Sequence, residues 1–292
     1  MLTVHSAQKL FWLWLLMNKF ALNIVVWWLL LNKAFAVSTF EISASGEHAW
    51  GPNETQAQAC ELAASKAKKD ALIKHFGELI GQKSLLECDA SIQKATGNDC
   101  ELFESSWSLI NSNGYIKGTD FRSTPYFSEL QKANICKVKG TVIIEEFAGK
   151  ADASFQTKVD LAEGLILRVG DQPQIRIKSN KAAYHYVFYW APYHDRDNYY
   201  RIFPNAVDKQ SMASQQLTIP SAEAVTTYNL DVTLPQDSTV SREYLILLSF
   251  KEPLKDVPET ISESGFFSWL QSFRRDLWTQ DKMSYRIIGG SI

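Results

Sequence analysis

The chain has no excess of basic residues and no tract of low complexity. Its 292 residues include 30 Lys and Arg against 32 Asp and Glu, which gives a formal net charge of −2. Because nucleic-acid-binding domains are typically strongly basic, this balance disfavours that class of function. Aromatic residues make up 12% of the chain and apolar residues occur along its whole length, which disfavours intrinsic disorder. The length is sufficient for one large domain or two modest ones.

Sequence motifs of common enzymes are also missing. The chain has no G-x-S-x-G or H-E-x-x-H segment and no phosphate-binding glycine loop. The adjacent acids Glu145 and Glu146 would point to opposite faces of a strand, so they cannot share a site. The histidines that follow residue 36 are scattered: His48, His75, His185 and His194. The sequence therefore predicts no catalytic residue, no cofactor and no metal ligand, and a hydrolase with a dispersed site is only a third hypothesis.

Acidic residues are absent from the first 36 positions. Read from Met17, this segment has the three parts of a secretory signal: Lys19, an apolar core at residues 21–31, and Ala-Phe-Ala at residues 34–36 as the cleavage site. We expect translation to start at Met17 and cleavage to follow Ala36. An uncleaved membrane anchor is the alternative, but polar residues interrupt the run of about 20 apolar residues that a span needs. The mature chain is therefore predicted to be periplasmic or secreted.

Cysteine is scarce: the chain has four, and none is spaced as C-x-x-C, which disfavours a zinc site. In an exported chain, an even number of cysteines favours disulfides. We expect Cys88 to pair with Cys100 and close a short loop. We expect Cys60 to pair with Cys136 and tie a helix to a strand. The connectivity stays open at this point, because four cysteines allow three pairings.

Residues 37–147 have the pattern of a small α+β domain. Residues 37–50 alternate apolar and polar side chains, as a half-buried strand does. A long helix is expected between a cap at Asn53 or Thr55 and the glycines at 77 and 81. Small residues follow one face of this helix, which lets it lie close against a sheet: Cys60, Ala63, Ala64, Ala67 and Ala71. Strands at 115–126 and 133–147 would complete a three-stranded sheet, and residues 102–110 suggest a second, shorter helix.

A small, polar linker at residues 148–156 precedes a region whose pattern is almost entirely β. Strands are expected over four stretches: within 165–205, and at 215–219, 226–234 and 242–250. Turn residues such as those at 179–180 separate the predicted strands. This regular spacing is typical of a β-sandwich of the Ig-like kind, so residues 157–292 are predicted to form one. A helix at 265–277 with an aromatic stripe and a last strand at 283–288 end the chain.

The aromatic hairpin at residues 184–200 is the best candidate for a binding surface. Its rings alternate along the chain, so one set could form an exposed platform that stacks on sugars or anchors a protein partner. The alternative is cross-strand packing beneath the C-terminal helix. Acidic residues at the hairpin tip offer oxygen ligands for calcium, but they also serve as turn formers. The candidate surface comprises Tyr186, Trp190, Tyr193, His194, Asp195, Asp197 and Tyr199.

Two parts of the chain resemble known families. Ala44-Ser45-Gly46, ahead of the alanine-striped helix, resembles the amino-terminal domain of flagellar T-ring assembly proteins and of related small envelope lipoproteins. Val169-Gly170-Asp171, Phe203-Pro204-Asn205 and Ile219-Pro220 resemble a bacterial envelope domain-of-unknown-function family with a V-G-D … L-F-P-N … I-P pattern, over about residues 163–253. The second resemblance implies an envelope accessory module, with no known ligand and no known enzyme activity.

These features favour a non-catalytic, exported accessory protein of the bacterial cell envelope that acts through protein–protein contact. Binding of glycan or peptidoglycan through residues 184–200 is the alternative. Nucleic acid is not an expected partner, and membrane contact is expected only through an uncleaved signal segment. The identity of the partner, the oligomeric state and the biological process cannot be read from the sequence.

Overall fold

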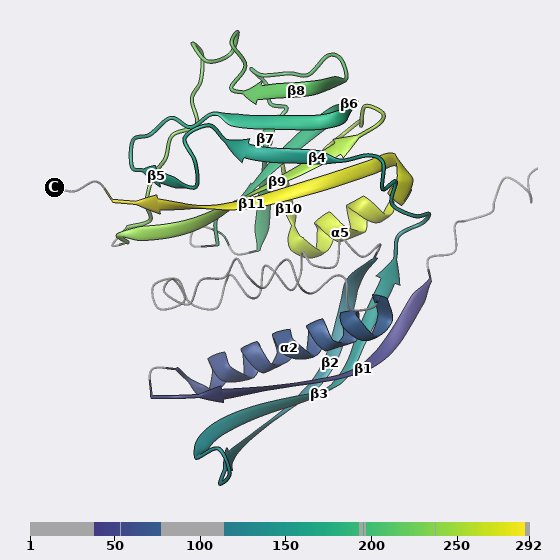
Figure 1. Cartoon of the computed structure of the whole chain (residues 1–292), viewed down its shortest axis with the longest axis vertical. Coiled ribbons are helices and arrows are strands. Elements are labelled where there is room, and N and C mark those ends of the chain that lie inside the picture. The colour runs from purple at the N-terminus through teal and green to yellow at the C-terminus, as the bar shows by residue number, and fades with distance from the viewer. Residues whose placement is uncertain are drawn as a thin grey trace, which may run out of the picture. The chain divides into compact units, whose positions relative to one another are not determined.

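The computed structural model describes residues 38–52, 54–76, 114–192, 195, 197–236 and 238–289. The predicted signal segment, the expected short helix at 102–110, the expected Cys88–Cys100 pair, and Tyr193 and His194 lie outside these residues. The described chain has a three-stranded sheet with one long helix, followed by a larger, mainly-β region with a second helix (Figure 1). This order confirms the predicted α+β part followed by a mainly-β part. Neither described helix is long and apolar enough to cross a membrane.

The first sheet is antiparallel and has the order β1-β3-β2, with β1 at Thr39–Trp50, β2 at Gly114–Ser128 and β3 at Ala133–Glu146. Helix α2 (Gln56–Phe76) lies along one face of this sheet (Figure 1). Ala63, Ala67 and Ala71 of the predicted stripe are buried, and Cys60 and Ala64 are partly buried against the same core. Ala59 is also buried, although the prediction did not include it. The alternation in the sequence and the alanine spacing therefore predicted this layer correctly.

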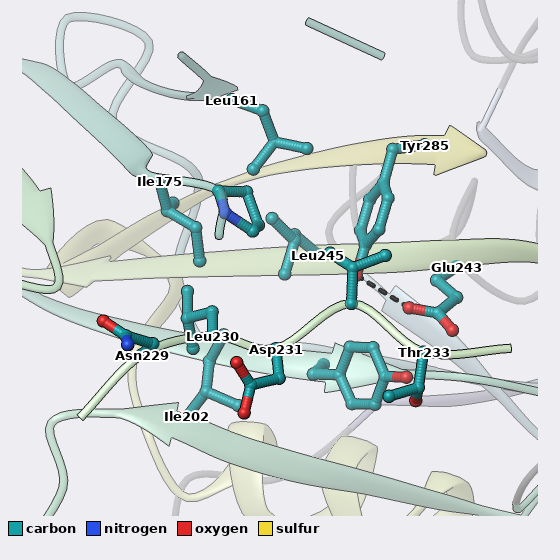
Figure 2. Close-up of a pocket in the computed structure, with 13 residues that line it drawn as sticks. Leu161, Ile175, Ile202, Asn229, Leu230, Asp231, Thr233, Glu243, Leu245 and Tyr285 are labelled. Carbon is teal, nitrogen blue, oxygen red and sulfur yellow. Dashed lines mark hydrogen bonds between the residues drawn. The ribbon is translucent and has the colours of Figure 1, made fainter. Parts of the chain in front are cut away.

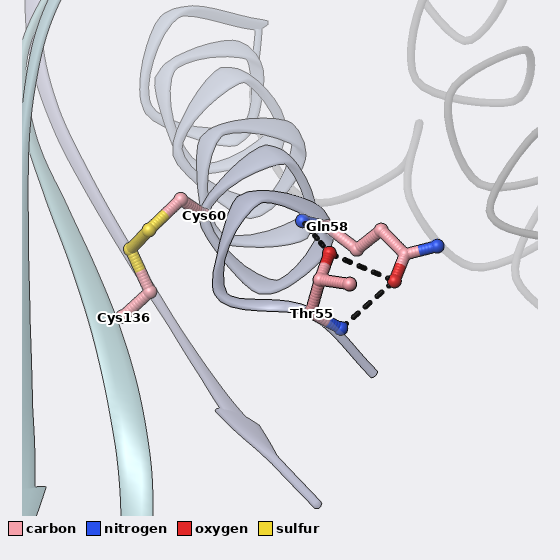
Figure 3. The surroundings of a disulfide bond; sticks show 4 residues. All are labelled: Thr55, Gln58, Cys60 and Cys136. Atoms are coloured by element: carbon pink, nitrogen blue, oxygen red, sulfur yellow. Dashed lines mark hydrogen bonds between the residues drawn. A yellow bond between two sulfur atoms is a disulfide. The ribbon is translucent and has the colours of Figure 1, made fainter. Parts of the chain in front are cut away.

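Thr55 caps α2 in the way that a capping box requires. The Thr55 Oγ1 atom accepts a hydrogen bond from the backbone nitrogen of Gln58 at 3.2 Å, and Gln58 Oε1 accepts one from the Thr55 backbone nitrogen at 2.8 Å (Figure 3). One turn further on, Cys60 forms a disulfide with Cys136 of β3 (Figure 3). The pairing expected between this helix and this strand is therefore present.

The larger region is built on an eight-stranded sheet. Six of the strands follow one another in the order β10-β7-β6-β9-β11-β5, and the other two, β4 and β8, each pair with β6. Helix α5 and a 3-10 turn, η3, precede the last strand (Figure 1). The bounds are β4 Thr157–Leu161, β5 Ile166–Arg168, β6 Ile175–Trp190, β7 Asn198–Phe203, β8 Ser214–Ile219, β9 Val240–Phe250, β10 Thr260–Ser262, α5 Glu263–Gln271, η3 Arg275–Leu277 and β11 Trp278–Ile288.

Strand β6 connects two groups of strands. Residues Ile175–Ser179 pair with β4, and overlapping positions pair with β8, whereas Tyr184–Trp190 pairs with β9. The predicted turn at residues 179–180 is therefore wrong, because β6 runs through it. The predicted strand at 226–234 is also wrong, since these residues are outside the strands of the structure. Their alternation has another cause: Val232 is buried and Leu230 and Leu234 pack on a core without joining the ladder.

Two hydrophobic cores lie on the opposite faces of β9. One is formed with α5 and contains Phe188, Phe250, Phe266 and Trp278. The other contains Val187, Leu247, Phe203 and Ile287. Because both faces are covered, nearly every residue of β9 is buried, as its unbroken apolar run predicted.

Tyr115 of β2 and Phe147, directly after β3, belong to the first of these cores. The ring of Tyr115 stacks on that of Phe267 at a centroid distance of 5.7 Å, and Phe147 meets Trp278 edge-on at 5.4 Å. The described residues all belong to one compact unit that includes both sheets. This finding does not test the predicted domain boundary at residues 148–156, which stays a prediction.

Candidate functional site

A pocket of about 250 Å³ opens on the second core of the larger region (Figure 2). Figure 2 shows Asn229 and Glu243 at opposite ends of it, with aliphatic side chains between them. Its walls come from β4, β6, β7, β9, β11, the segment at 229–233 and Pro173, which lies just before β6. The lining residues are Leu161, Pro173, Ile175, Tyr189, Ile202, Asn229, Leu230, Asp231, Val232, Thr233, Glu243, Leu245 and Tyr285. Residues separated by more than a hundred positions thus form one concave surface.

Glu243 provides a buried carboxylate at one end of the pocket. It is 3% exposed, and Tyr285 Oη donates to its Oε2 atom at 2.8 Å (Figure 2). Burial raises the pKa of Tyr189, and the charge of Glu243 and a hydrogen bond to it act in the same direction. Burial and the charge of Glu243 likewise raise the pKa of Tyr285 well above its ordinary value. Both phenols therefore stay protonated and serve as hydrogen-bond donors to the carboxylate.

The segment at 229–233 is held over the pocket by the turn at Val169-Gly170-Asp171. The backbone nitrogen of Gly170 donates to the carbonyl oxygen of Val232 at 3.0 Å, and the nitrogen of Val232 donates to the carbonyl oxygen of Asp171 at 3.3 Å. Gly170 has a φ of +89°, a conformation that favours glycine. Asp171 Oδ2 closes the turn by accepting from the nitrogen of Arg168 at 2.7 Å.

Asn205 fixes a second wall of the pocket. Its Nδ2 atom donates to the carbonyl oxygen of Ile202 at 2.9 Å, and its Oδ1 atom accepts from the nitrogen of Asp208 at 2.7 Å. Asp208 Oδ2 in turn accepts from the nitrogen of Ser221 at 2.8 Å, directly after Ile219-Pro220. The motifs V-G-D, F-P-N and I-P thus lie in turns, and these turns position residues that line the pocket.

Comparison with known proteins matches this same part of the chain. Residues 166–240 match the family DUF4384, a domain of unknown function. The match supports the resemblance drawn from the three turn motifs, all of which lie inside it. No curated protein and no solved structure matches the chain. The resemblance of the N-terminal part to flagellar T-ring assembly proteins finds no support in these comparisons.

The aromatic surface predicted within the DUF4384 segment is largely inside the protein. Tyr186 and Trp190 are each 5% exposed and Tyr199 is 2% exposed, so the prediction that they form an outward platform is wrong. The physical reason is α5, whose Phe266 meets Tyr199 at 5.2 Å between ring centroids. The alternative, cross-strand packing beneath the C-terminal helix, is what the structure shows. Tyr189 is the aromatic residue of this strand that reaches the pocket.

Asp195 and Asp197 shape the tip of the hairpin. Asp195 Oδ2 accepts hydrogen bonds from Tyr200 Oη at 2.5 Å and from Asn198 Nδ2 at 2.8 Å, while its Oδ1 accepts from the backbone nitrogen of Asp197 at 3.0 Å. These bonds lower the pKa of Asp195. The contacts are those of a turn former, and among the described residues no group of three His, Cys, Asp or Glu is placed to hold a metal ion.

His185 and Ser249 form a pair with the residue types of a nucleophile and its base, with 2.8 Å between Nδ1 and Oγ. Both residues are fully buried, and His185 Nε2 lies 3.0 Å from the carbonyl oxygen of Ser214. A carbonyl oxygen only accepts, so Nε2 carries the proton of the neutral ring and Nδ1 accepts from Ser249. The pair is enclosed in the sheet, where a substrate has no access to it.

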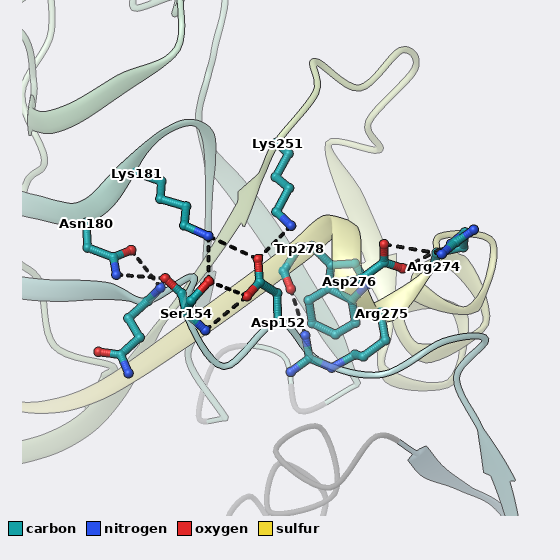
Figure 4. A network of polar contacts seen from close by, with 10 residues as sticks. Asp152, Ser154, Asn180, Lys181, Lys251, Arg274, Arg275, Asp276 and Trp278 are labelled. Carbon is teal, nitrogen blue, oxygen red and sulfur yellow. Dashed lines mark hydrogen bonds and ion pairs between the residues drawn. The ribbon is translucent and has the colours of Figure 1, made fainter.

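Asp152 anchors the predicted linker to the larger region (Figure 4). Its Oδ2 atom meets Lys251 Nζ at 2.8 Å and Lys181 Nζ at 3.1 Å, and its Oδ1 atom accepts from Ser154 Oγ at 2.6 Å. Bonds from Lys251, Ser154 and Lys181 hold the pKa of Asp152 well below its usual range. Phe155, directly after Ser154, is 2% exposed. Residues 152–155 are therefore held against the larger region by these contacts.

Sequence reasoning did not identify the pocket. Its buried charged group, Glu243, lies in an apolar strand, and the phenol partner of Glu243, Tyr285, lies in the last strand. The one available signal was the acid itself, because a charged residue inside a strand covered on both faces needs a buried partner. No feature of the sequence indicated which residue that partner would be.

Proposed function

We propose that this chain is a non-catalytic, exported accessory protein of the bacterial cell envelope that acts through contact with another protein. We place the contact surface at the tip of the β2–β3 hairpin. The observation that supports it is an exposed apolar group at this tip: Tyr126 is 40% exposed, Phe127 52% and Leu130 94%. Large apolar side chains gathered in one exposed place are a common feature of protein-binding sites.

The tip is an ordered structure rather than a loose loop. Ser128 Oγ accepts a hydrogen bond from the backbone nitrogen of Gln131 at 3.2 Å, and Lys132 forms an ion pair with Glu129 at 2.7 Å. An ordered tip presents its side chains at a smaller entropic cost on binding. This favours a surface that is already formed before the partner arrives.

The hairpin is suited to binding through side chains rather than through its backbone. Strand β2 is an edge of the three-stranded sheet formed by the described residues. It carries Pro125, which has no N–H, and the charged Arg122 near the middle of its length. Proline and charge on an edge strand oppose addition of another strand. We therefore infer that the partner contacts the rings and Leu130, and not the strand edge.

The competing functions have less support. A glycan platform would need exposed rings at Tyr186, Trp190 and Tyr199, and these rings are buried. A hydrolase would need an accessible nucleophile, and the His185–Ser249 pair is enclosed. The signal segment supports export, and a mature chain that starts at Val37 in mass spectrometry is the expected result.

Site-specific photocrosslinking in cells tests the contact surface. A photoreactive residue in place of Leu130 should give one discrete adduct, and Phe127→Ser in the same chain should weaken it. A photoreactive residue at Met212, which is 74% exposed, is the matched control and should not give this adduct. Equal labelling at the two positions, or no adduct at position 130, would refute the proposed surface.

A further inference from the structure

We infer that the pocket on the second core of the larger region binds a small amphipathic organic cation, namely an ammonium group on a short aliphatic stem. This site is separate from the hairpin tip, and the inference does not depend on the proposed function. It rests on three properties of the pocket: its size, the chemistry of its walls, and the sign of the charged groups that line it.

The size limits the ligand to a few heavy atoms. The pocket has a volume of about 250 Å³. Pockets for drug-sized ligands and cofactors range from about 300 to 1,000 Å³. A nucleotide cofactor is therefore too large, whereas one long side chain or a short alkyl chain with a polar head fits the space.

The walls match an aliphatic stem. Seven of the lining side chains are aliphatic or proline: Leu161, Pro173, Ile175, Ile202, Leu230, Val232 and Leu245. Ile175, Leu230 and Leu245 lie between Asn229 and Glu243 (Figure 2). A stem of four or five methylene groups would remove this apolar surface from water, and each buried methylene contributes about 0.8 kcal/mol in transfer data.

The charged groups select a cation. Glu243 and Asp231 are acidic, and none of the described lining residues is basic. Glu243 is buried and Asp231 is exposed, so a ligand meets a negative group both outside and inside. The carboxylate of Glu243 is fixed by Tyr285, which donates to it at 2.8 Å. An ammonium would therefore find an acceptor whose position is set before binding.

The tyrosines add a second preference for positive charge. Tyr189 and Tyr285 both line the pocket, and their rings lie beside the acid that their hydroxyl groups contact. The face of a phenol ring attracts ammonium and guanidinium groups. A neutral alcohol of equal length gains the apolar contacts but neither the ion pair nor this attraction.

The test compares n-pentylammonium with pentan-1-ol, using amide shifts of residues 230–233 in NMR titrations of the mature chain. We expect saturable binding of pentylammonium and binding of pentanol at least about tenfold weaker, because a charge-assisted hydrogen bond is lost. Nα-acetyl-lysine methylamide is a third probe: binding of it equal to that of pentylammonium assigns the ligand to a partner's lysine. Binding of the free amine alone assigns it to a small molecule.

Two variants locate the site. Thr233→Trp should place a large ring in the pocket beside Glu243 and abolish binding of pentylammonium, while Thr226→Trp, at an exposed threonine outside the pocket, should leave it unchanged. Glu243→Gln should remove the preference for the amine over the alcohol. Equal affinity for the two probes, unchanged binding in Thr233→Trp, or no binding of pentylammonium would each overturn the inference.

Discussion

A Cβ atom added to Gly46 of β1 would lie 2.1 Å from the backbone oxygen of Ala63 in α2. It would also lie 2.6 Å from the backbone nitrogen of Ala67. Strand and helix thus approach each other backbone to backbone, which needs a residue without a side chain on the strand and small residues on the helix. This contact gives a physical reason for the order of Ala44-Ser45-Gly46 followed by an alanine stripe.

The first prediction is that Gly46→Ala destabilises the protein by about 2 kcal/mol or more, because the methyl group meets backbone atoms that cannot move away cheaply. Urea unfolding followed by circular dichroism measures the change. Gly51→Ala is the matched control, since no atom lies within 4 Å of a Cβ at that position. Similar losses in the two variants would show that the close approach does not limit stability.

The second prediction concerns the disulfide between Cys60 and Cys136, which closes a loop with a sequence separation of 76 residues. Removing such a link frees the unfolded chain, so Cys60→Ala with Cys136→Ala should lower the free energy of unfolding by about 2 to 4 kcal/mol. Wild-type protein in dithiothreitol should lose a similar amount. A Cys88→Ala, Cys100→Ala variant should still respond to dithiothreitol, and its failure to do so would assign the stabilisation to the other cysteines.

The N-terminal layer was predictable because its signals are local. Alternation in β1, the Thr55 cap and the alanine spacing of α2 each act within a few residues. The Cys60–Cys136 pair followed from placing one cysteine on that helix and the other on a strand. Features of this kind can be predicted from the local sequence, without knowing how distant segments pack together.

The pocket and the buried aromatic rings depend on distant segments. Alternation along β6 correctly indicated two faces, but it could not show that α5 covers one of them with Phe266 and Trp269. Likewise, the alternation of apolar and polar residues at 226–234 correctly indicated that Val232 is buried. It could not indicate whether a neighbouring strand was present to pair with this segment. In both places tertiary packing, rather than local propensity, decides the outcome.

The third prediction concerns Glu145, which is 5% exposed and joins β3 to α5. Its Oε2 atom accepts from Tyr115 Oη at 2.7 Å and from Gln271 Nε2 at 2.8 Å, and Lys117 contacts Oε1. Glu145→Gln should lower the free energy of unfolding by about 1 to 3 kcal/mol at pH 7, because the buried donors lose a charged acceptor. Glu129→Gln, at the exposed hairpin tip, is the control and should change it by less than about 0.5 kcal/mol.

The effect of Glu145→Gln should also depend on pH. Burial alone would raise the pKa of Glu145, but hydrogen bonds from Lys117, Tyr115 and Gln271 lower it below the ordinary value. The carboxylate therefore contributes stability above its unfolded pKa of about 4.3, and this contribution is lost as the pH falls through the folded pKa. The gap between wild type and variant should shrink in urea titrations at low pH. A gap that stays constant would contradict the role of the charge.

The fourth prediction concerns His185, whose pKa is lowered by burial although the carbonyl of Ser214 acts in the opposite direction. The folded protein holds this ring neutral, whereas the unfolded chain takes up a proton below about pH 6.5. The unfolded state then binds more protons, so the free energy of unfolding falls as the pH drops from about 7 to 5. His185→Gln keeps a polar side chain beside Ser249 but cannot titrate, and it should flatten this part of the curve.

Ser249→Ala tests the hydrogen bond to His185 separately from the protonation of His185. It removes the hydroxyl that lies 2.8 Å from Nδ1 and keeps the buried imidazole. Its free energy of unfolding should be lower at every pH, because a buried partner is lost, by about 1 kcal/mol. Its slope between pH 7 and 5 should remain that of the wild type, since the titrating ring is still buried. A slope that disappears in Ser249→Ala but persists in His185→Gln would mean that another group binds the proton on unfolding.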